Sequence, residues 1–216
     1  MISEPAGTAT GPDTAEKSRR PGGRTARNTA AVLDATLSEL GEHGYAGLSV
    51  DRVAARSGVH KATVYRRWGG VDGLLAAALE YSADDDWRPP ETGSLRGDLA
   101  ELAREVAEGF TGGGEGAAIA SACIAASFQS AAAADALHAF LADRLARCAA
   151  VVGAAESRGE VPPGTDGADV VRAAIAPVYY RLFIGREPVS AEDAARYAHA
   201  AADSARSGAF AGTDRG

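Results

Sequence analysis

Hydrophobic residues recur at intervals of three and four over most of the chain, the spacing of one face of an α-helix. Gly44 marks the expected end of the first such stripe, which consists of Ala26, Ala30, Leu33, Leu37 and Leu40. No stretch alternates apolar and polar residues as a half-buried β-strand does. The pattern therefore predicts an all-α protein of about nine helices.

Two short helices are expected after the first one. The pattern predicts them at 50–57 and 60–68, with Ser49 as the N-cap of the first. Gly58 separates them and can adopt the positive φ that a sharp turn needs, and a glycine pair at 69–70 ends the second. Two short helices joined by a glycine turn, behind a longer support helix, have the form of a helix-turn-helix.

Helical spacing continues through the rest of the chain. Capping residues and glycine or proline breaks divide it into six further helices, expected at about 71–88, 95–111, 116–130, 132–158, 167–182 and 191–207. The expected organisation is a flexible tail, a helix-turn-helix domain, a larger helical domain and a second flexible tail, at 1–23, 24–70, 71–207 and 208–216.

The formal net charge of -7 argues by itself against a nucleic-acid partner, but the charge is unevenly distributed. From Lys17 to Arg67 there are ten Lys or Arg against four Asp or Glu, a local balance of +6. From Tyr81 to the end there are twelve against twenty, a balance of -8. This separation indicates a basic reading domain attached to an acidic one.

The sequence contains no motif that indicates an enzyme. Metal-ligand spacings, nucleotide-binding fingerprints and nucleophile–base motifs are absent, so no cofactor is expected. Cys123 and Cys148 lie in alanine-rich helical contexts and are interpreted as buried thiols. The uncharged stretch 116–134 is rich in alanine and serine, which insert poorly into membranes, so a buried helix is expected there and no membrane partner. The N-terminus lacks an apolar signal segment, and a cytoplasmic location is expected.

The second short helix has a distinct outward face. If Val64 points between the helices, a wheel of about 100° per residue places Ala62 and Arg66 outward. Arginine can pair bidentately with guanine and a methyl group can contact a thymine methyl, whereas edge cations and a phenol suit phosphates. The candidate DNA-binding residues of this helix are Lys61, Ala62, Thr63, Tyr65, Arg66 and Arg67.

Further phosphate contacts are expected from outside this helix. The helix N-terminus at Ser49 offers amide donors, and Arg24 and Arg27 lie at the start of the first helix. The basic run at 17–20 could reach phosphates or the minor groove. A basic helical face is often only solvated, however, and the pattern alone leaves that alternative open.

The segment 58–68, GVHKATVYRRW, resembles the recognition-helix signature of the tetracycline-repressor (TetR) family, and the similarity extends over about residues 25–78. A looser similarity to a regulatory-domain subtype of that family covers 177–182, PVYYRL. The resemblance implies a homodimer whose last two helices form a four-helix bundle. It also implies a palindromic operator and repression released by a small ligand. The family's DNA-facing positions coincide with the outward face just described.

Three positions depart from the family pattern. His60 opens the recognition helix where Ser or Thr is common, and Val71, followed by Asp72, stands where a phosphate-binding lysine is common. Asp51 lies near the start of the first motif helix, where a carboxylate repels phosphate unless it accepts a hydrogen bond from a cytosine amine. Because of these departures, binding to the DNA backbone is expected to depend more on Arg24 and Arg27 of the first helix.

In the resembled family the middle helices enclose a ligand cavity and the last two helices form the dimer interface. Candidate cavity residues are Trp87, Phe110, Cys123, Phe128, Gln129, His138 and Phe140. Candidate interface residues are Val171, Ile175, Val178, Leu182, Tyr197, Ala198 and Ala201. Ordinary core packing is the alternative for both sets, because the same residue types fill the interiors of helical proteins.

The leading hypothesis is a DNA-binding repressor whose partners are double-stranded DNA, a second copy of the chain and a small-molecule effector. The alternative is a DNA-binding regulator without such an effector, controlled by a protein partner or by its abundance. A large apolar cavity in the larger domain would favour the first, and a filled core would favour the second.

Overall fold

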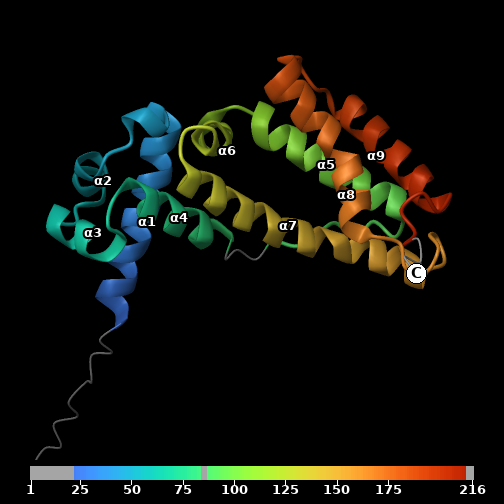
Figure 1. Cartoon of the computed structure of the whole chain (residues 1–216), viewed down its shortest axis with the longest axis horizontal. Helices are drawn as coiled ribbons and strands as arrows, with labels where there is room; N and C mark the ends of the chain where they lie inside the picture. Colours follow the sequence, from blue (N-terminus) through green and yellow to red (C-terminus); the bar gives the residue numbers. More distant parts are fainter. Residues whose placement is uncertain (1–21, 84–86, 213–216) are drawn as a thin grey trace, which may run out of the picture.

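The computed structural model describes residues 22–83 and 87–212 and confirms the all-α prediction (Figure 1). These residues form nine α-helices and one π-helical turn, and the described part contains no strand. The helices are α1 (Gly22–Gly47), α2 (Val50–Ser57), α3 (Lys61–Trp68), α4 (Val71–Ala83), α5 (Leu95–Thr111), α6 (Gly114–Ser127), α7 (Ala131–Ser157), α8 (Gly167–Tyr179) and α9 (Ala191–Arg206), with the π-helical turn η1 at Tyr180–Gly185 between the last two.

Helices α1 to α4 form an N-terminal unit around one apolar core. Val53 of α2, Val64 of α3 and Leu74 of α4 are all completely buried in it. Gly44, where the sequence predicts the end of the first helix, is a break inside α1, with φ 65° and ψ 178°. Because only glycine takes this conformation readily, the helix changes direction there before Gly47.

Helices α5 to α9 form a C-terminal unit in which α5, α8 and α9 pack together and the long α7 runs from beside α4 to the opposite end (Figure 1). The buried face of α9 consists entirely of alanine: Ala194, Ala198, Ala201, Ala202 and Ala205. Small side chains on this face let α9 lie close to α5 and α8. The wider apolar residues of this core come from α5, α7 and α8.

The two units meet where α1 packs against α6 and α4 packs against α7. At Gly41 of α1, an added Cβ would lie 2.9 Å from Cγ1 of Ile119 on α6, so a larger residue there would force Ile119 to shift. Asp72 of α4 accepts hydrogen bonds from the hydroxyls of Tyr45 and Ser130, the second at 3.0 Å. Asp72, which follows the Val71 that stands in place of a family lysine, therefore connects the N-terminal unit to the start of α7.

The predicted single helix at 167–182 is divided in the structure. Pro177 lies inside α8 and has no N–H for the helical ladder, and the chain passes into η1 from Tyr180. The turn ends at Arg186, whose φ is 54°. Leu182, expected to continue the apolar stripe of α8, therefore belongs to η1.

The predicted tails need correction where they overlap the described residues. Gly22 and Gly23 belong to α1. Residues 208–212 are held against the loop before α8: the Asp166 N–H donates to the Phe210 carbonyl at 2.8 Å, and the Gly212 N–H donates to the Gly164 carbonyl at 3.2 Å. The rest of both tails, 1–21 and 213–216, lies outside the described residues.

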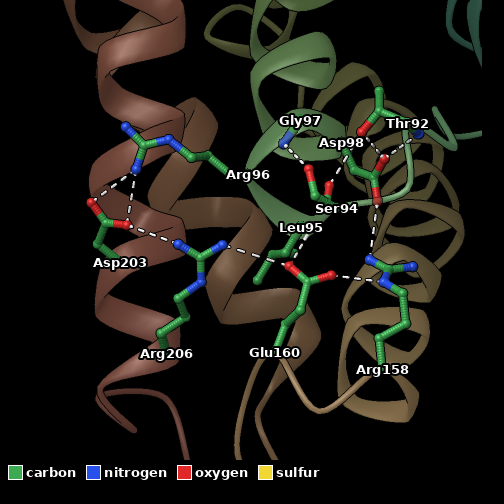
Figure 2. Close-up of polar contacts among 10 residues, drawn as sticks. All are labelled: Thr92, Ser94, Leu95, Arg96, Gly97, Asp98, Arg158, Glu160, Asp203 and Arg206. Atoms are coloured by element: carbon green, nitrogen blue, oxygen red, sulfur yellow. Dashed lines mark hydrogen bonds and ion pairs between the residues drawn. The ribbon is translucent and has the colours of Figure 1, made fainter.

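A chain of polar contacts joins α5, α9 and the residues after α7 (Figure 2). The Glu160 carboxylate accepts from the Leu95 N–H at 3.0 Å and from Arg158 at 2.7 Å, and lies 3.6 Å from Arg206. The Asp98 carboxylate, only 2% exposed, accepts from the Thr92 N–H and hydroxyl at 2.6 and 2.7 Å. These contacts fix the N-terminus of α5 against α9.

Replacing Glu160 with glutamine should lower the free energy of unfolding by about 1–2 kcal/mol at pH 7, because hydrogen bonds to charged groups are lost. Burial raises the pKa of Glu160, but the hydrogen bonds from Arg158 and Leu95 and the charges of Arg158 and Arg206 lower it more. The pKa of Glu160 is therefore lower in the folded chain than in the unfolded one. The ionised carboxylate stabilises the folded state fully above the unfolded-state pKa of about 4.3, and this stabilisation is lost as the pH falls through the folded-state pKa.

The measurement is urea unfolding of wild type and Glu160→Gln at several pH values, with exposed Glu91→Gln as the control. The difference between wild type and variant should shrink below about pH 4. A difference that does not depend on pH would contradict the charged role of Glu160.

Within the described residues, no helix combines the length and the apolar character that crossing a membrane requires.

Candidate nucleic-acid interface

The local sequence fixes both ends of the two short helices. The Ser49 hydroxyl accepts from the Arg52 N–H at 3.3 Å and caps α2. Gly58 follows with φ 68°, which gives the sharp turn before α3. His60 caps α3 in place of the usual Ser or Thr, because its Nδ1 accepts from the Ala62 N–H at 3.3 Å. Gly69, with φ 75°, ends α3.

The outward face of α3 has the residues that the helical wheel predicts. Val64 is completely buried between the helices, and Thr63 is half-buried. The remaining predicted residues are exposed: Lys61, Ala62, Tyr65, Arg66 and Arg67. The guanidinium of Arg67 lies 5.0 Å from the ring centre of Trp68, a cation–π contact that orients it. The exposed surface of α3 is thus cationic, with one phenol and one methyl group.

Lys61 is paired with Asp51, one of the departures from the family pattern. The Lys61 Nζ lies 2.5 Å from the Asp51 Oδ1, and this hydrogen bond raises the pKa of Lys61. Asp51 remains 67% exposed at its side chain. The pair joins α2 to α3 and partly neutralises the cation at the edge of the face. Sequence reasoning missed the pairing because the two residues are adjacent only across the turn.

A hollow of about 400 Å³ connects α3 to the start of α1. It is lined from α1 by Thr25, Asn28 and Thr29 and from the α3 region by Val59, Thr63, Arg66, Arg67 and Trp68. Arg24 and Arg27, exposed in the first turns of α1, lie next to these residues in sequence. Sequence reasoning did not select the polar α1 residues Thr25, Asn28 and Thr29, although their spacing of three and four puts them on one helical face.

The candidate cavity residues do not form one group. Trp87 and Phe140 both contact the Arg144 guanidinium, which lies 4.7 and 5.5 Å from their ring centres. Phe110 packs edge-on against Tyr179 and Phe183 instead, with centroid distances of 5.4 and 4.9 Å.

The other four candidate cavity residues lie elsewhere. Cys123 is buried in the apolar core of the N-terminal unit. Phe128, 81% exposed, and the exposed Gln129 and His138 lie at the surface of the described chain, so a contact with a ligand stays a prediction for them. Phe128 and Gln129 follow the end of α6, where an apolar residue points to solvent.

The candidate interface residues also need correction. Four of them are buried in the chain's own core and cannot contact a second copy: Val171, Val178, Ala198 and Ala201. The three others, Ile175, Leu182 and Tyr197, are half-buried and pack against the same core. A helical stripe indicates which face is buried but not whether the covering surface belongs to the same chain.

The closely packed α2–α3 pair, the sharp turn at Gly58 and the cationic outward face of α3 define a helix-turn-helix protein of the DNA-binding regulator class. Residues 32–78 match the family model for bacterial regulatory proteins of the tetR family, and residues 89–201 match that for the tetracyclin repressor-like C-terminal domain. The chain therefore belongs to the TetR family of transcription regulators.

Known relatives agree with this assignment. The TetR family transcription regulator SCO0332, a solved structure, is 30% identical, with 82% of this chain and 97% of that chain covered and a TM-score of 0.65. The regulator YdeS of Bacillus subtilis is 26% identical over 74% of this chain and 80% of its own length. An uncharacterised HTH-type regulator of Mycobacterium tuberculosis is 48% identical over 71 residues, 33% of this chain and 35% of that protein. The match thus spans about a third of that relative's length.

More distant structures share the fold. FadR from Bacillus subtilis, solved in complex with stearoyl-CoA, is 15% identical and has a TM-score of 0.56, with 83% of this chain and 98% of that chain covered.

Changing Asp51 to asparagine should strengthen binding to any DNA duplex, because Lys61 loses its carboxylate partner and can neutralise a phosphate. The slope of log affinity against log salt should become steeper by about 0.9 for each phosphate newly neutralised. Fluorescence anisotropy of a labelled random duplex across a salt series measures both the affinity and this slope.

The matched control is Asp143→Asn on α7, which removes the same charge from an ion pair with Arg147 far from α3. Equal slopes for wild type and Asp51→Asn would show that the pair does not limit phosphate binding by Lys61.

Proposed function

We propose that this chain is a homodimeric repressor that binds a palindromic operator through α2 and α3 and is released from it by a small-molecule effector. The observation that carries the proposal is the exposed cationic face of α3. The helix-turn-helix that presents this face has a capped α2, a capped α3 and a buried apolar contact between them. Arg66 reads base edges, while Tyr65 and Arg67 contact phosphates. Arg24, Arg27 and the amide groups near Ser49 add backbone contacts.

The hollow between α1 and α3 supports a continuous DNA-binding surface. Arg66 and Arg67 line it on one side and the polar side chain of Asn28 on the other. A sugar–phosphate backbone that follows the groove edge would lie between these two elements. Asn28 is then a further candidate phosphate contact, beside the exposed Arg27.

The exposed faces of α8, η1 and α9 are the proposed dimer interface. Tyr180 and Ile184 are 62% and 67% exposed, although both are large apolar residues. They lie on the side of α8 and η1 opposite to the buried stripe, near the exposed Arg172 and Ala176. A second copy of the chain would cover this surface and place two α3 helices on successive half-sites.

The proposed effector site lies beside Arg144 of α7, next to α5. Trp87 and Phe140 are half-buried against the Arg144 guanidinium and retain ring surface for a ligand. Phe110 packs apart from them against Tyr179 and Phe183. The Arg144 guanidinium over two of these rings favours an effector that combines a flat apolar part with a negative charge. FadR, which has a similar fold, was solved in complex with stearoyl-CoA, and this supports an apolar, negatively charged ligand for the C-terminal unit.

The operator proposal is tested by fluorescence anisotropy of a labelled duplex taken from upstream of the chain's own gene, with random duplex as the reference. Specific binding of two protomers with a steep salt dependence is expected. Equal weak binding to both duplexes would require selection of the operator from a random library. No binding at low salt would show that the helix-turn-helix does not bind DNA.

The effector proposal is tested by screening small aromatic and fatty acids for release of that operator. Release by a compound that no longer acts on Trp87→Ala would support the site. If the chain binds its operator normally and no tested compound releases it, the alternative is favoured, a regulator controlled by a protein partner or by its abundance.

A further inference from the structure

A group of potential metal ligands lies on α1, on the side that faces α2. Glu39, Glu42 and His43 occupy positions i, i+3 and i+4, which share one face of a helix. One ligand atom from each residue lies within 4.8 Å of the other two. The His43 Nε2 is 3.5 Å from the Glu39 Oε2 and 3.7 Å from the Glu42 Oε2.

Arg56 of α2 already holds both carboxylates in place. Its Nε donates to the Glu39 Oε1 at 2.7 Å and its Nη2 donates to the Glu42 Oε2 at 2.5 Å. These hydrogen bonds raise the pKa of Arg56 and lower that of Glu42, so Glu42 is ionised. Ligating carboxylates in metal sites are commonly hydrogen-bonded as well. On Glu39 the bond is to Oε1 and leaves Oε2 open, whereas on Glu42 it is to the same Oε2 that lies 3.7 Å from the His43 Nε2.

The second oxygen of Glu39 has no hydrogen-bond donor. The Glu39 side chain is only 7% exposed, and its Oε2 is buried without a hydrogen bond. The nearest cationic atoms are the His43 Nε2 and the Arg52 Nη1, the latter 3.9 Å away. A buried carboxylate oxygen that accepts no hydrogen bond costs free energy, and this one lies within 4.8 Å of the ligand atoms of Glu42 and His43.

We propose that Glu39, Glu42 and His43 bind a divalent first-row transition-metal cation, such as Zn²⁺ or Co²⁺. One imidazole and two carboxylates form a nitrogen–oxygen ligand set that suits these ions, whereas Mg²⁺ and Ca²⁺ prefer oxygen ligands alone. The ion completes the coordination of the Glu39 Oε2 while Arg56 keeps the Oε1. Glu42 and His43 are partly exposed, with 48% and 36% of their side chains accessible, so water fills the remaining positions.

The site lies at the junction of α1 and α2 and is separate from the proposed effector site. All three ligands lie on α1. An ion bound to them holds Glu39 and Glu42 in the positions from which they bind Arg56 of α2. An ion that binds the folded chain and not the unfolded one raises the free energy of unfolding by RT ln(1 + c/Kd), where c is the concentration of free ion, so the melting temperature rises with that concentration.

The test is isothermal titration of the full-length chain with ZnCl₂ in chelator-free buffer, together with the visible spectrum of added Co²⁺. His43→Ala is the main variant, because its partly exposed side chain makes no hydrogen bond to the core. His138→Ala, an exposed histidine on α7, is the matched control. Burial raises the pKa of Cys123 and of Cys148 to about 11, so these thiols compete poorly for the ion.

Saturable binding of one ion per chain is expected for wild type and His138→Ala, with an affinity at least about 10-fold weaker in His43→Ala. Glu39→Gln should weaken binding as well, with circular dichroism used to confirm that it folds. Equal binding by wild type and His43→Ala would overturn the site. Absence of saturable binding by the wild-type chain would overturn it as well.

Discussion

Replacing Ile184 with aspartate is expected to convert the proposed dimer into a monomer and to weaken operator binding by roughly 100- to 10,000-fold. Ile184 is 67% exposed on η1, beside Tyr180 at 62%. In a dimer, a buried aspartate there would lose its hydration without gaining a partner. A monomer would bind each half-site independently and lose the effective concentration that links the two recognition helices.

Light scattering after size exclusion measures the mass, and anisotropy on full and half operators measures the affinity. Tyr180→Asp should have the same effect. Leu141→Asp on α7, also an exposed apolar residue, is the control and should stay dimeric. A dimeric mass for both Ile184→Asp and Tyr180→Asp would show that the outer face of α8 and η1 is not the interface.

Replacing Arg66 with alanine is expected to remove most of the discrimination between operator and random DNA. Arg66 is exposed on the outward face of α3 and has the geometry to pair bidentately with guanine. Each such pair contributes about 1–3 kcal/mol, which corresponds to about 5- to 150-fold at each half-site. Two half-sites would compound the loss on the full operator.

The ratio of affinities for operator and random duplex, measured at one salt concentration, is the relevant quantity. Arg104→Ala on α5 removes the same charge from an ion pair with Glu101 and Glu108 and serves as the control. An equal loss on both duplexes would assign Arg66 to phosphate binding instead of base reading.

The helix-turn-helix could be predicted from the sequence because its determinants are local. Ser49 and Gly58 act within one or two turns of their own position, and the apolar period places Val64 inward. The helices of the C-terminal unit were predicted for the same reason, including the capping box of Ser190 and Asp193.

Contacts between elements could not be predicted from those patterns. Asp51 was expected either to oppose phosphate binding or to accept a hydrogen bond from a cytosine amine, and its pairing with Lys61 depends on the turn geometry. Asp72 was identified as a departure, but its hydrogen bonds to Tyr45 and Ser130 depend on how α4 meets α7. The stripe containing Val171 and Val178 correctly indicated burial and wrongly suggested a second chain as the covering surface. Periodicity describes one helix at a time.

The all-alanine inner face of α9 keeps the chain's own core separate from the outer surface of the same helix. Substitutions at exposed positions such as Arg196 and Ala200 leave that inner packing unchanged. If two copies of the chain pair through the outer surfaces of α8 and α9, substitutions on these surfaces can change which chains pair with each other. The packing of each chain's own core then stays the same. Gene duplication could then yield two non-interacting regulators through a few surface changes, each free to acquire its own operator.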